Sequence, residues 1–409
     1  MSAFAAGLLA SGCLPKSPPE TPPPTFTVGP TFTPTGAPTT TPTATSTVAP
    51  SPTATPAPTS TATPAPTLTP TLTPTLSPSP TATPPSPALS RVAIARAVGY
   101  DRAAVRQQVQ TLLDGLGGLD GVLSRGDRVA IKVNLTGGTG VGALPGVPAV
   151  ESFATHPEVV RALGELLRDA GAGQLFIVEA VWDPKSYPLW GYEEVARGLG
   201  ATLIDLNAPQ PYKDFLSAPV GEDWFIYPEY TVNPILQEID VFVSVAKLKC
   251  HWSCGVTLSL KNLVGLTPTG HYRCKPDDSN RTDLHGCDGD FKARLPRVVV
   301  DLSRVRPIHL ALIDGIKTVE AGEGPWIKTM APVAPGVLVA GKNPVATDAV
   351  AAAVMGFDPA AVYPAAPFLR SDNHLSLAHA RGLGPYRLEE IEVVGASIAD
   401  VRYNFSPCW

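Results

Sequence analysis

The residues with the clearest capacity for chemistry are lysines that stand within or directly after apolar runs. Lys132 lies inside the run 128–134, and Lys247 and Lys249 follow the run 241–246. An unpaired ammonium group is costly to bury, so each lysine must meet a counter-charge or an anionic ligand. Ammonium groups bind phosphate and carboxylate oxygens. We therefore expect a pocket for a small phosphate or carboxylate, with these binding residues: Lys132, Asn134, Lys247, Lys249, Lys261 and Asn262.

His251 belongs to the same segment and adds a group that can move a proton. Lys247, Lys249 and His251 alternate along the chain. Because alternate residues of an extended chain point to the same side, we expect all three to face the pocket. The other interpretation is a solvated basic loop, the commoner fate of a run of charges. It is disfavoured because these lysines lie among Val, Leu and Trp rather than among polar residues.

Three carboxylates follow later segments and could complete the site. Asp314 directly follows the run 308–313, Glu320 comes shortly after it, and Asp348 stands near the start of a helical segment. Oxygen ligands from separate elements suit a divalent cation such as Mg²⁺, and Asp314 or Glu320 could instead act as a general base. Alternatively, the carboxylates pair with the lysines, and Asp348 stabilises the first turn of its own helix.

An α/β fold would position these residues. Several apolar runs are continuous, which is typical of strands buried on both faces of a parallel sheet. The predicted strands are 91–96, 128–134, 174–179, 202–206, 241–246, 308–313, 336–340 and 391–394, and the predicted helices are 102–116, 157–170, 192–199, 295–305 and 346–355. This alternation predicts a mostly parallel sheet with helices on both faces, built as one body or as two lobes. Ligands of such sheets bind beyond the carboxyl ends of the strands.

Residues 91 to about 394 resemble the domain of unknown function 362 family. The matching stretches are Lys132-Val133-Asn134-Leu135, Thr155-His156-Pro157-Glu158-Val159-Val160, Lys247-Leu248-Lys249 with His251, Gly255-Val256-Thr257 through Leu260-Lys261-Asn262-Leu263, Ile313-Asp314-Gly315, and Asn343-Pro344-Val345-Ala346-Thr347-Asp348-Ala349-Val350. The resemblance implies an α/β fold and a shared site, but no generally established activity. Some relatives carry a ferredoxin-like segment, whose tight four-cysteine run is missing here. The stretch 320–325 is one residue longer than usual, so Glu323 is not counted among the predicted site residues.

Five cysteines follow Cys13: Cys250, Cys254, Cys274, Cys287 and Cys408. We predict a disulfide between Cys274 and Cys287 that closes the polar loop 271–290, since an exported protein can keep disulfides. The other arrangement is a metal or Fe–S site built from Cys250, Cys254, Cys274 and Cys287. Its spacing lacks the tight pairs of common zinc sites.

The first 90 residues differ in kind from the rest. Half of the 46 prolines lie between Pro15 and Pro87, and Lys16 and Glu20 are the only charged residues before Arg91. Residues 1–13 resemble a bacterial lipoprotein signal that ends at Cys13, the expected lipidation site. Residues 14–90 predict a disordered Pro/Thr/Ser-rich linker, and 91–409 the α/β domain. We therefore expect an extracytoplasmic protein, anchored to a membrane by lipid or secreted.

Composition and missing motifs exclude several classes. A net charge of −5 gives no reason to expect nucleic-acid binding. No Gly-x-Gly-x-x-Gly follows a predicted strand, and no Gly-x-Ser-x-Gly is present, which disfavours dinucleotide enzymes and α/β-hydrolases. Three hypotheses stay open: an anion-binding protein that could be a metal-assisted enzyme, a non-catalytic ligand-binding lipoprotein, and a metal-dependent or Fe–S redox protein.

Overall fold

A computed structural model describes residues 89–139, 144–278, 281–287 and 289–408. The predicted signal with Cys13, and the linker as far as residue 88, lie outside the described residues.

One mostly parallel sheet of eight strands runs through the molecule. From one edge to the other, its strands are β14 (Ile391–Gly395), β1 (Ser90–Arg96), β13 (Val337–Gly341), β10 (Leu310–Gly315), β7 (Val241–Lys247), β2 (Arg128–Lys132), β3 (Gln174–Glu179) and β4 (Thr202–Asp205). Only β13 runs against the others, because it pairs antiparallel with β1 and with β10. The other five pairs are parallel, so these strands end at the same edge.

Both faces of the sheet are buried, which explains the continuous apolar runs. In β1, Val92 and Ile94 contribute to one hydrophobic cluster, while Ala93 and Ala95 contribute to the other. In β7, Val243 and Val245 face the cluster formed with α1 and α2. Successive residues of a strand point to opposite faces, so apolar side chains are needed at every position.

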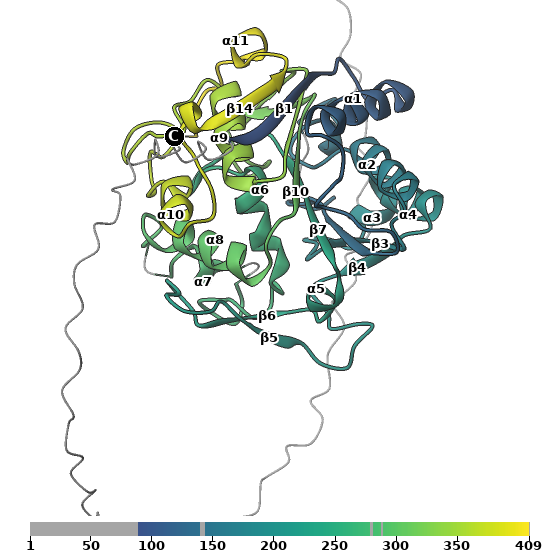
Figure 1. Ribbon diagram of the computed structural model, residues 1–409. Helices are drawn as coiled ribbons and strands as arrows, with labels where there is room; N and C mark the ends of the chain where they lie inside the picture. The colour runs from purple at the N-terminus through teal and green to yellow at the C-terminus, as the bar shows by residue number, and fades with distance from the viewer. Residues whose placement is uncertain (1–88, 140–143, 279–280, 288, 409) are drawn as a thin grey trace, which may run out of the picture. The chain divides into compact units, whose positions relative to one another are not determined.

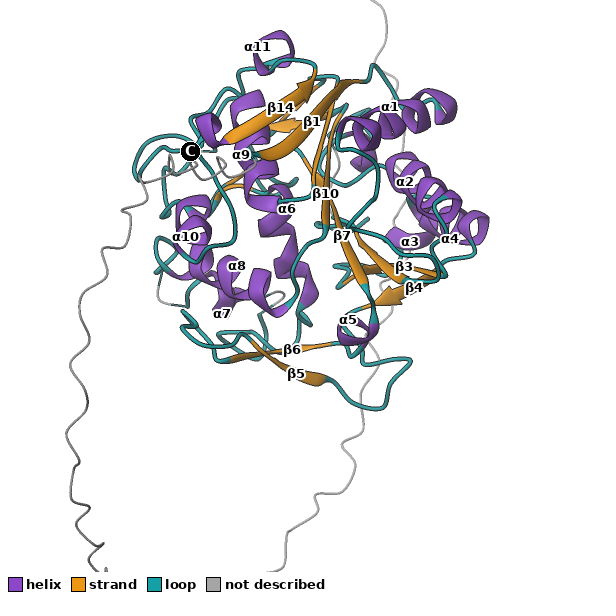
Figure 2. Ribbon diagram, in the orientation of Figure 1, coloured by secondary structure: helices purple, strands orange, loops and turns teal. Residues whose placement is uncertain are grey.

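Helices cover the sheet on both sides (Figure 1). The first layer contains α1 (Arg102–Gly115), α2 (Pro157–Asp169), α3 (Ser186–Leu189) and α4 (Tyr192–Leu199). The second contains α5 (Ile235–Glu238), α6 (Leu258–Lys261), α7 (Thr282–His285), α8 (Arg294–Val305), α9 (Pro344–Val354), α10 (His374–Ala380) and α11 (Ile398–Val401). Figure 2 shows the strands passing between these two groups of helices.

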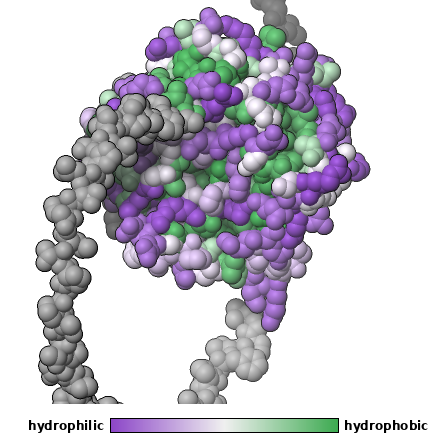
Figure 3. All heavy atoms as spheres, viewed as in Figure 1, coloured by the Kyte–Doolittle hydropathy of each residue, from purple (hydrophilic) through white to green (hydrophobic). Residues whose placement is uncertain are grey.

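Short elements fill the connections between the larger ones. They are the 3₁₀ helices η1 (Ala149–Glu151), η2 (Asn262–Leu266) and η3 (Leu388–Glu390), and the strand pairs β5 (Leu216–Pro219) with β6 (Glu229–Val232), β8 (Cys250–His251) with β9 (Gly255–Val256), and β11 (Thr318–Glu320) with β12 (Ala331–Val333). None of the helices in the described part of the chain combines the length and the apolar character of a membrane span. The face drawn in Figure 3 mixes hydrophilic residues with smaller hydrophobic areas.

The sequence-based fold is confirmed. All eight predicted strands are strands of the central sheet, and all five predicted helices are present with ends that differ by at most about two residues. The two-lobe alternative is not what the structure shows, because one sheet connects the described residues. The six shorter α-helices and the three small strand pairs were not predicted.

Candidate functional site

A cavity of about 730 Å³ opens where the parallel strands end. Asn134 follows β2, Trp182 follows β3 and Lys249 follows β7, and all three line it. The helical segment that begins with α6 contributes Lys261 and Asn262, the loop after η2 contributes Arg281, and α7 contributes His285. The cavity therefore lies where ligands of open α/β sheets bind.

The polar floor of the cavity is one connected network. Lys132 Nζ forms an ion pair with Glu179 at 2.9 Å and donates to Asn262 Oδ1 at 3.1 Å. The same oxygen accepts from Asn134 Nδ2, and Asn134 Oδ1 accepts from Lys249 Nζ, both at 3.1 Å. Burial lowers the pKa of Lys132 and raises that of Glu179, while the ion pair opposes both shifts. The network fixes its amides and lysines in one arrangement.

A glycine allows the floor to close over this ion pair. A Cβ atom at Gly265 would lie 2.3 Å from Glu179 Oε1 and 2.7 Å from Lys132 Nζ. The backbone of η2 therefore packs directly on the charged pair, and a larger residue would displace it.

Lys249 is held on all three of its donor positions. Its Nζ donates to Asn134 Oδ1, to the Phe153 carbonyl at 2.6 Å and to the Glu323 carbonyl at 3.0 Å. Burial lowers its pKa to about 7. With a pKa near 7, Lys249 carries only part of a positive charge at neutral pH, and it has no spare N–H for a ligand without losing one of these bonds.

Lys261 differs from the other buried lysines of the cavity. It lines the cavity and is only 8% exposed, yet no hydrogen bond or ion pair joins its Nζ to another of the described residues. Burial lowers its pKa to about 8, and the nearby cations Arg281 and Lys132 add to the effect. An ammonium group in this position is the donor most available to a ligand.

The buried charges around the cavity are unbalanced. Four basic groups, each at most 9% exposed, face two carboxylates; they are Lys132, Lys249, Lys261 and Arg281, against Glu179 and Glu323. Two nitrogens of Arg281 donate to backbone carbonyls, and its pKa falls to about 10 because of burial. The surplus positive charge favours an anion in the cavity.

Two neutral histidines lie near Lys261. Burial lowers the pKa of His251 well below its usual range and that of His285 to about 4. His285 Nδ1 lies 2.8 Å from the Arg281 carbonyl, so this nitrogen carries the proton and Nε2 is an acceptor. Ser253 N donates to His251 Nδ1 at 3.3 Å, which leaves the proton of that ring on Nε2. The rings add one donor and one acceptor without adding charge.

Glu323 belongs to the cavity, contrary to its exclusion on the sequence. Its Oε2 accepts from Trp252 N at 3.0 Å, and its Oε1 from Trp326 Nε1 at 2.9 Å. Its carbonyl binds Lys249. The extra residue in the stretch 320–325 therefore does not remove Glu323 from the site.

Lys247 does not face the cavity, because strand β7 includes this residue and fixes the direction of its side chain. Its side chain points to the same face of the sheet as those of Val243 and Val245. In the register of the two strands, Lys247 of β7 is the partner of Asp314 of β10. The two side chains form an ion pair of 2.8 Å and are 0% exposed. Asp314 also accepts from Tyr100 Oη, His156 N and Ile316 N. The structure thus pairs Lys247 with Asp314 and brings neither side chain to the cavity.

The other predicted carboxylates also lie away from the cavity. Glu320 accepts from Ser406 N at 2.7 Å. Asp348 accepts from Ser259 N and Leu260 N at the start of α6, and burial raises its pKa to about 7. Asp314, Glu320 and Asp348 therefore form no common metal site. Asp348 instead holds the short helix that ends in Lys261.

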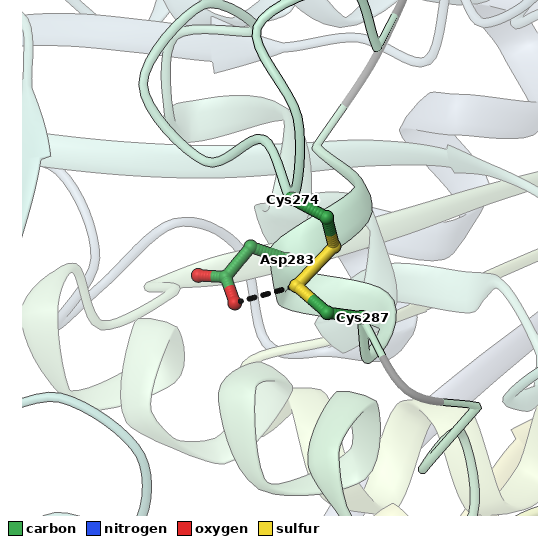
Figure 4. Close-up of side chains that lie close together, drawn as sticks. All are labelled: Cys274, Asp283 and Cys287. Atoms are coloured by element: carbon green, nitrogen blue, oxygen red, sulfur yellow. Dashed lines mark hydrogen bonds between the residues drawn. A yellow bond between two sulfur atoms is a disulfide. The ribbon is translucent and has the colours of Figure 1, made fainter.

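The cysteines separate into different environments. Cys274 and Cys287 form the predicted disulfide, with Cα atoms 5.4 Å apart (Figure 4). Cys254 lies 3.6 Å from His374 Nδ1, and Cys250 contacts the Ser406 carbonyl. The cluster of Cys250, Cys254, Cys274 and Cys287 expected for a redox protein is therefore not formed. Asp283 lies beside the disulfide, but both sulfur atoms are already bonded to each other.

The profile of the family described as Domain of unknown function (DUF362) matches residues 129–353, more than half of the chain. The chain belongs to this family. All residues that line the cavity lie within the matched segment. The cavity is thus a feature of the DUF362 region itself, not of the segments that precede or follow it.

Two further similarities accompany the family match. "Thylakoid-associated protein sll1697" of Synechocystis sp. is 26% identical over 272 residues, which cover 66% of this chain and 76% of the relative. A crystal structure of a protein from Thermotoga maritima is 11% identical with a TM-score of 0.28, and covers 58% of this chain and 55% of its own. The second similarity is too small to bear on fold or function.

The structure adds cavity residues that the sequence did not assign to the site. They include Glu179, Arg281, His285, Glu323, Trp182, Trp252 and Trp326. Glu179 could have been found, because it is a charge at the carboxyl end of an apolar strand. Arg281 lies in a loop whose polar composition indicates an exposed turn, so nothing local reveals its burial.

Proposed function

We propose that this protein binds a small anion, a phosphate or a carboxylate, in the cavity at the carboxyl edge of its sheet. The observation that carries the proposal is Lys261, a nearly buried ammonium group that lines the cavity without a bonding partner among the described residues. Burying a charge in this way is unfavourable unless a ligand compensates it. Lys249, Lys132 and Arg281 supply further positive charge, and Asn134 and Asn262 are held beside them.

Binding is favoured over metal-assisted catalysis by the positions of the carboxylates. Asp314, Glu320 and Asp348 are bonded in three different places, whereas the cations share one cavity. The histidines and Glu323 could still move a proton on a bound substrate. The proposal therefore includes an enzyme only in the form of an acid–base site around an anion.

We place this function outside the cytoplasm, at a membrane surface. The Cys274–Cys287 disulfide supports export, since disulfides persist in oxidising compartments. The lipoprotein-like end at Cys13 and the proline-rich stretch supply an anchor and a spacer. The name of the thylakoid-associated relative also points to a membrane.

Calorimetric titration of the full chain with orthophosphate, and separately with acetate, tests the binding proposal. We expect Lys261→Met to weaken binding of the preferred anion by about tenfold to a hundredfold, the worth of a hydrogen bond to a charged group. Lys213→Met is the matched control, because Lys213 is exposed and does not line the cavity. If neither anion binds to the wild-type chain, or if both variants bind alike, the proposal fails.

A further inference from the structure

The mouth of the cavity has a different chemistry from its floor. Trp182 and Trp326 line the cavity and are 36% and 42% exposed, while the lysines below them are nearly buried. The two indole rings are close to parallel, with centroids 6.1 Å apart and planes inclined by 15°. Exposed tryptophans are informative because burying such a ring is strongly favourable. Here two of them line one cavity.

The Trp326 ring is held in position by its neighbours. Its Nε1 donates to Glu323 Oε1 at 2.9 Å. Gly324 leaves the ring room, since a Cβ atom there would lie 2.3 Å from Trp326 Cη2. The Trp326 ring is therefore already ordered before a ligand binds, so binding does not have to immobilise this side chain.

Most polar groups beside the two rings are already bonded, although no hydrogen bond joins the indole N–H of Trp182 to another of the described residues. The Asp183 carboxylate accepts from Thr139 N, Thr139 Oγ1 and Lys185 N. The indole N–H of Trp326 is bound to Glu323. Apart from the N–H of Trp182, what these residues offer a ligand is ring faces, which favours a flat aromatic group over a sugar with its many hydroxyls.

The size of the cavity also exceeds what a simple anion needs. Its volume of about 730 Å³ falls in the range of about 300–1,000 Å³ typical of sites for small organic molecules. We propose that the ligand is an anion that carries a planar aromatic ring, with its acidic group near Lys261 and its ring against Trp182 and Trp326. This inference rests on the proposed anion-binding function and names the class of ligand.

The test compares three phosphate monoesters that have the same acidic group. The full chain is titrated with methyl phosphate, phenyl phosphate and glucose phosphate. We expect phenyl phosphate to bind about tenfold more tightly than methyl phosphate, as an aromatic contact allows. In the double variant Trp182→Ala with Trp326→Ala, this preference should disappear while methyl phosphate binds as before. Trp224→Ala is the control, because Trp224 is exposed outside the cavity.

Each outcome separates the two proposals. If methyl phosphate binds but phenyl phosphate binds no better, or glucose phosphate binds best, the aromatic assignment is wrong and anion binding stands. If the double variant loses all three ligands equally, the tryptophans stabilise the fold of the site and do not contact the aromatic ring of the ligand. The aromatic assignment is then also wrong. If none of the esters binds to the wild type, the failure lies in the anion site itself, and both proposals fall.

Discussion

The structure predicts opposite effects on stability for the same substitution at two buried lysines. Lys247→Met leaves the Asp314 carboxylate buried without its ammonium partner. Removing one member of a buried pair costs about 3 to 5 kcal/mol of the free energy of unfolding. Lys261→Met removes an ammonium group that has no partner among the described residues and replaces it with an apolar chain of similar length.

The stability gained by replacing Lys261 with methionine follows from the pKa of this lysine. The pKa is lowered from 10.5 to about 8, so the folded protein holds the proton less tightly than the unfolded chain. This cost in the free energy of folding is fully present below pH 8. It disappears as the pH rises toward 10.5, the pKa of the lysine in the unfolded chain. At pH 7 it corresponds to about 3 kcal/mol. We therefore expect Lys261→Met to be neutral, or to raise the free energy of unfolding by up to about 3 kcal/mol.

Urea unfolding of the full chain without added anion, followed by circular dichroism at pH 7, measures both effects. Lys213→Met is the exposed control and should stay within about 0.5 kcal/mol of the wild type. A loss of about 3 kcal/mol or more for Lys261→Met would show that this lysine is an internal structural charge. That result would refute the reasoning that leads to the ligand.

Two other predictions concern the supports of the site. Replacing Cys274 and Cys287 by serine should lower the free energy of unfolding by about 3 kcal/mol, the loop entropy removed by a disulfide with a sequence separation of 13; an unchanged urea midpoint would contradict this. Because the pKa of Asp348 is raised to about 7, its contribution to stability grows as the pH falls below 7. Between pH 8 and pH 5 the wild type should gain about 3 kcal/mol more than Asp348→Asn, and parallel pH profiles would contradict the assignment.

The sheet could be predicted because a strand that is buried on both faces has a continuous apolar sequence. Runs such as Val241–Ala246 contain an apolar or small residue at every position, and the helices between them have a clear period. The short helix α6 carries no such period within its four residues. Its position depends on Asp348, which is distant in sequence and bonds to its first N–H groups.

Individual site residues were harder to predict because their direction depends on where a strand ends. Lys247 and Lys249 alternate along the chain, but they do not point to the same side, because β7 ends at Lys247 and the chain then leaves the strand. Lys247 therefore meets Asp314 on one face, while Lys249 reaches the cavity. Arg281 and Glu323 join the site through loops, and no local pattern shows which loop residues will be buried.

Proton uptake on anion binding tests the central claim most directly. Sulfate keeps its double charge between pH 7 and pH 9, so any proton taken up goes to the protein. A bound anion near Lys261 should raise its pKa above about 8. Titration of the full chain with sulfate at pH 8, in two buffers of different ionisation enthalpy, should therefore show uptake of a fraction of a proton. Lys261→Met should reduce this uptake and Lys213→Met should preserve it. Binding without proton uptake, or equal uptake in all three proteins, would contradict the account.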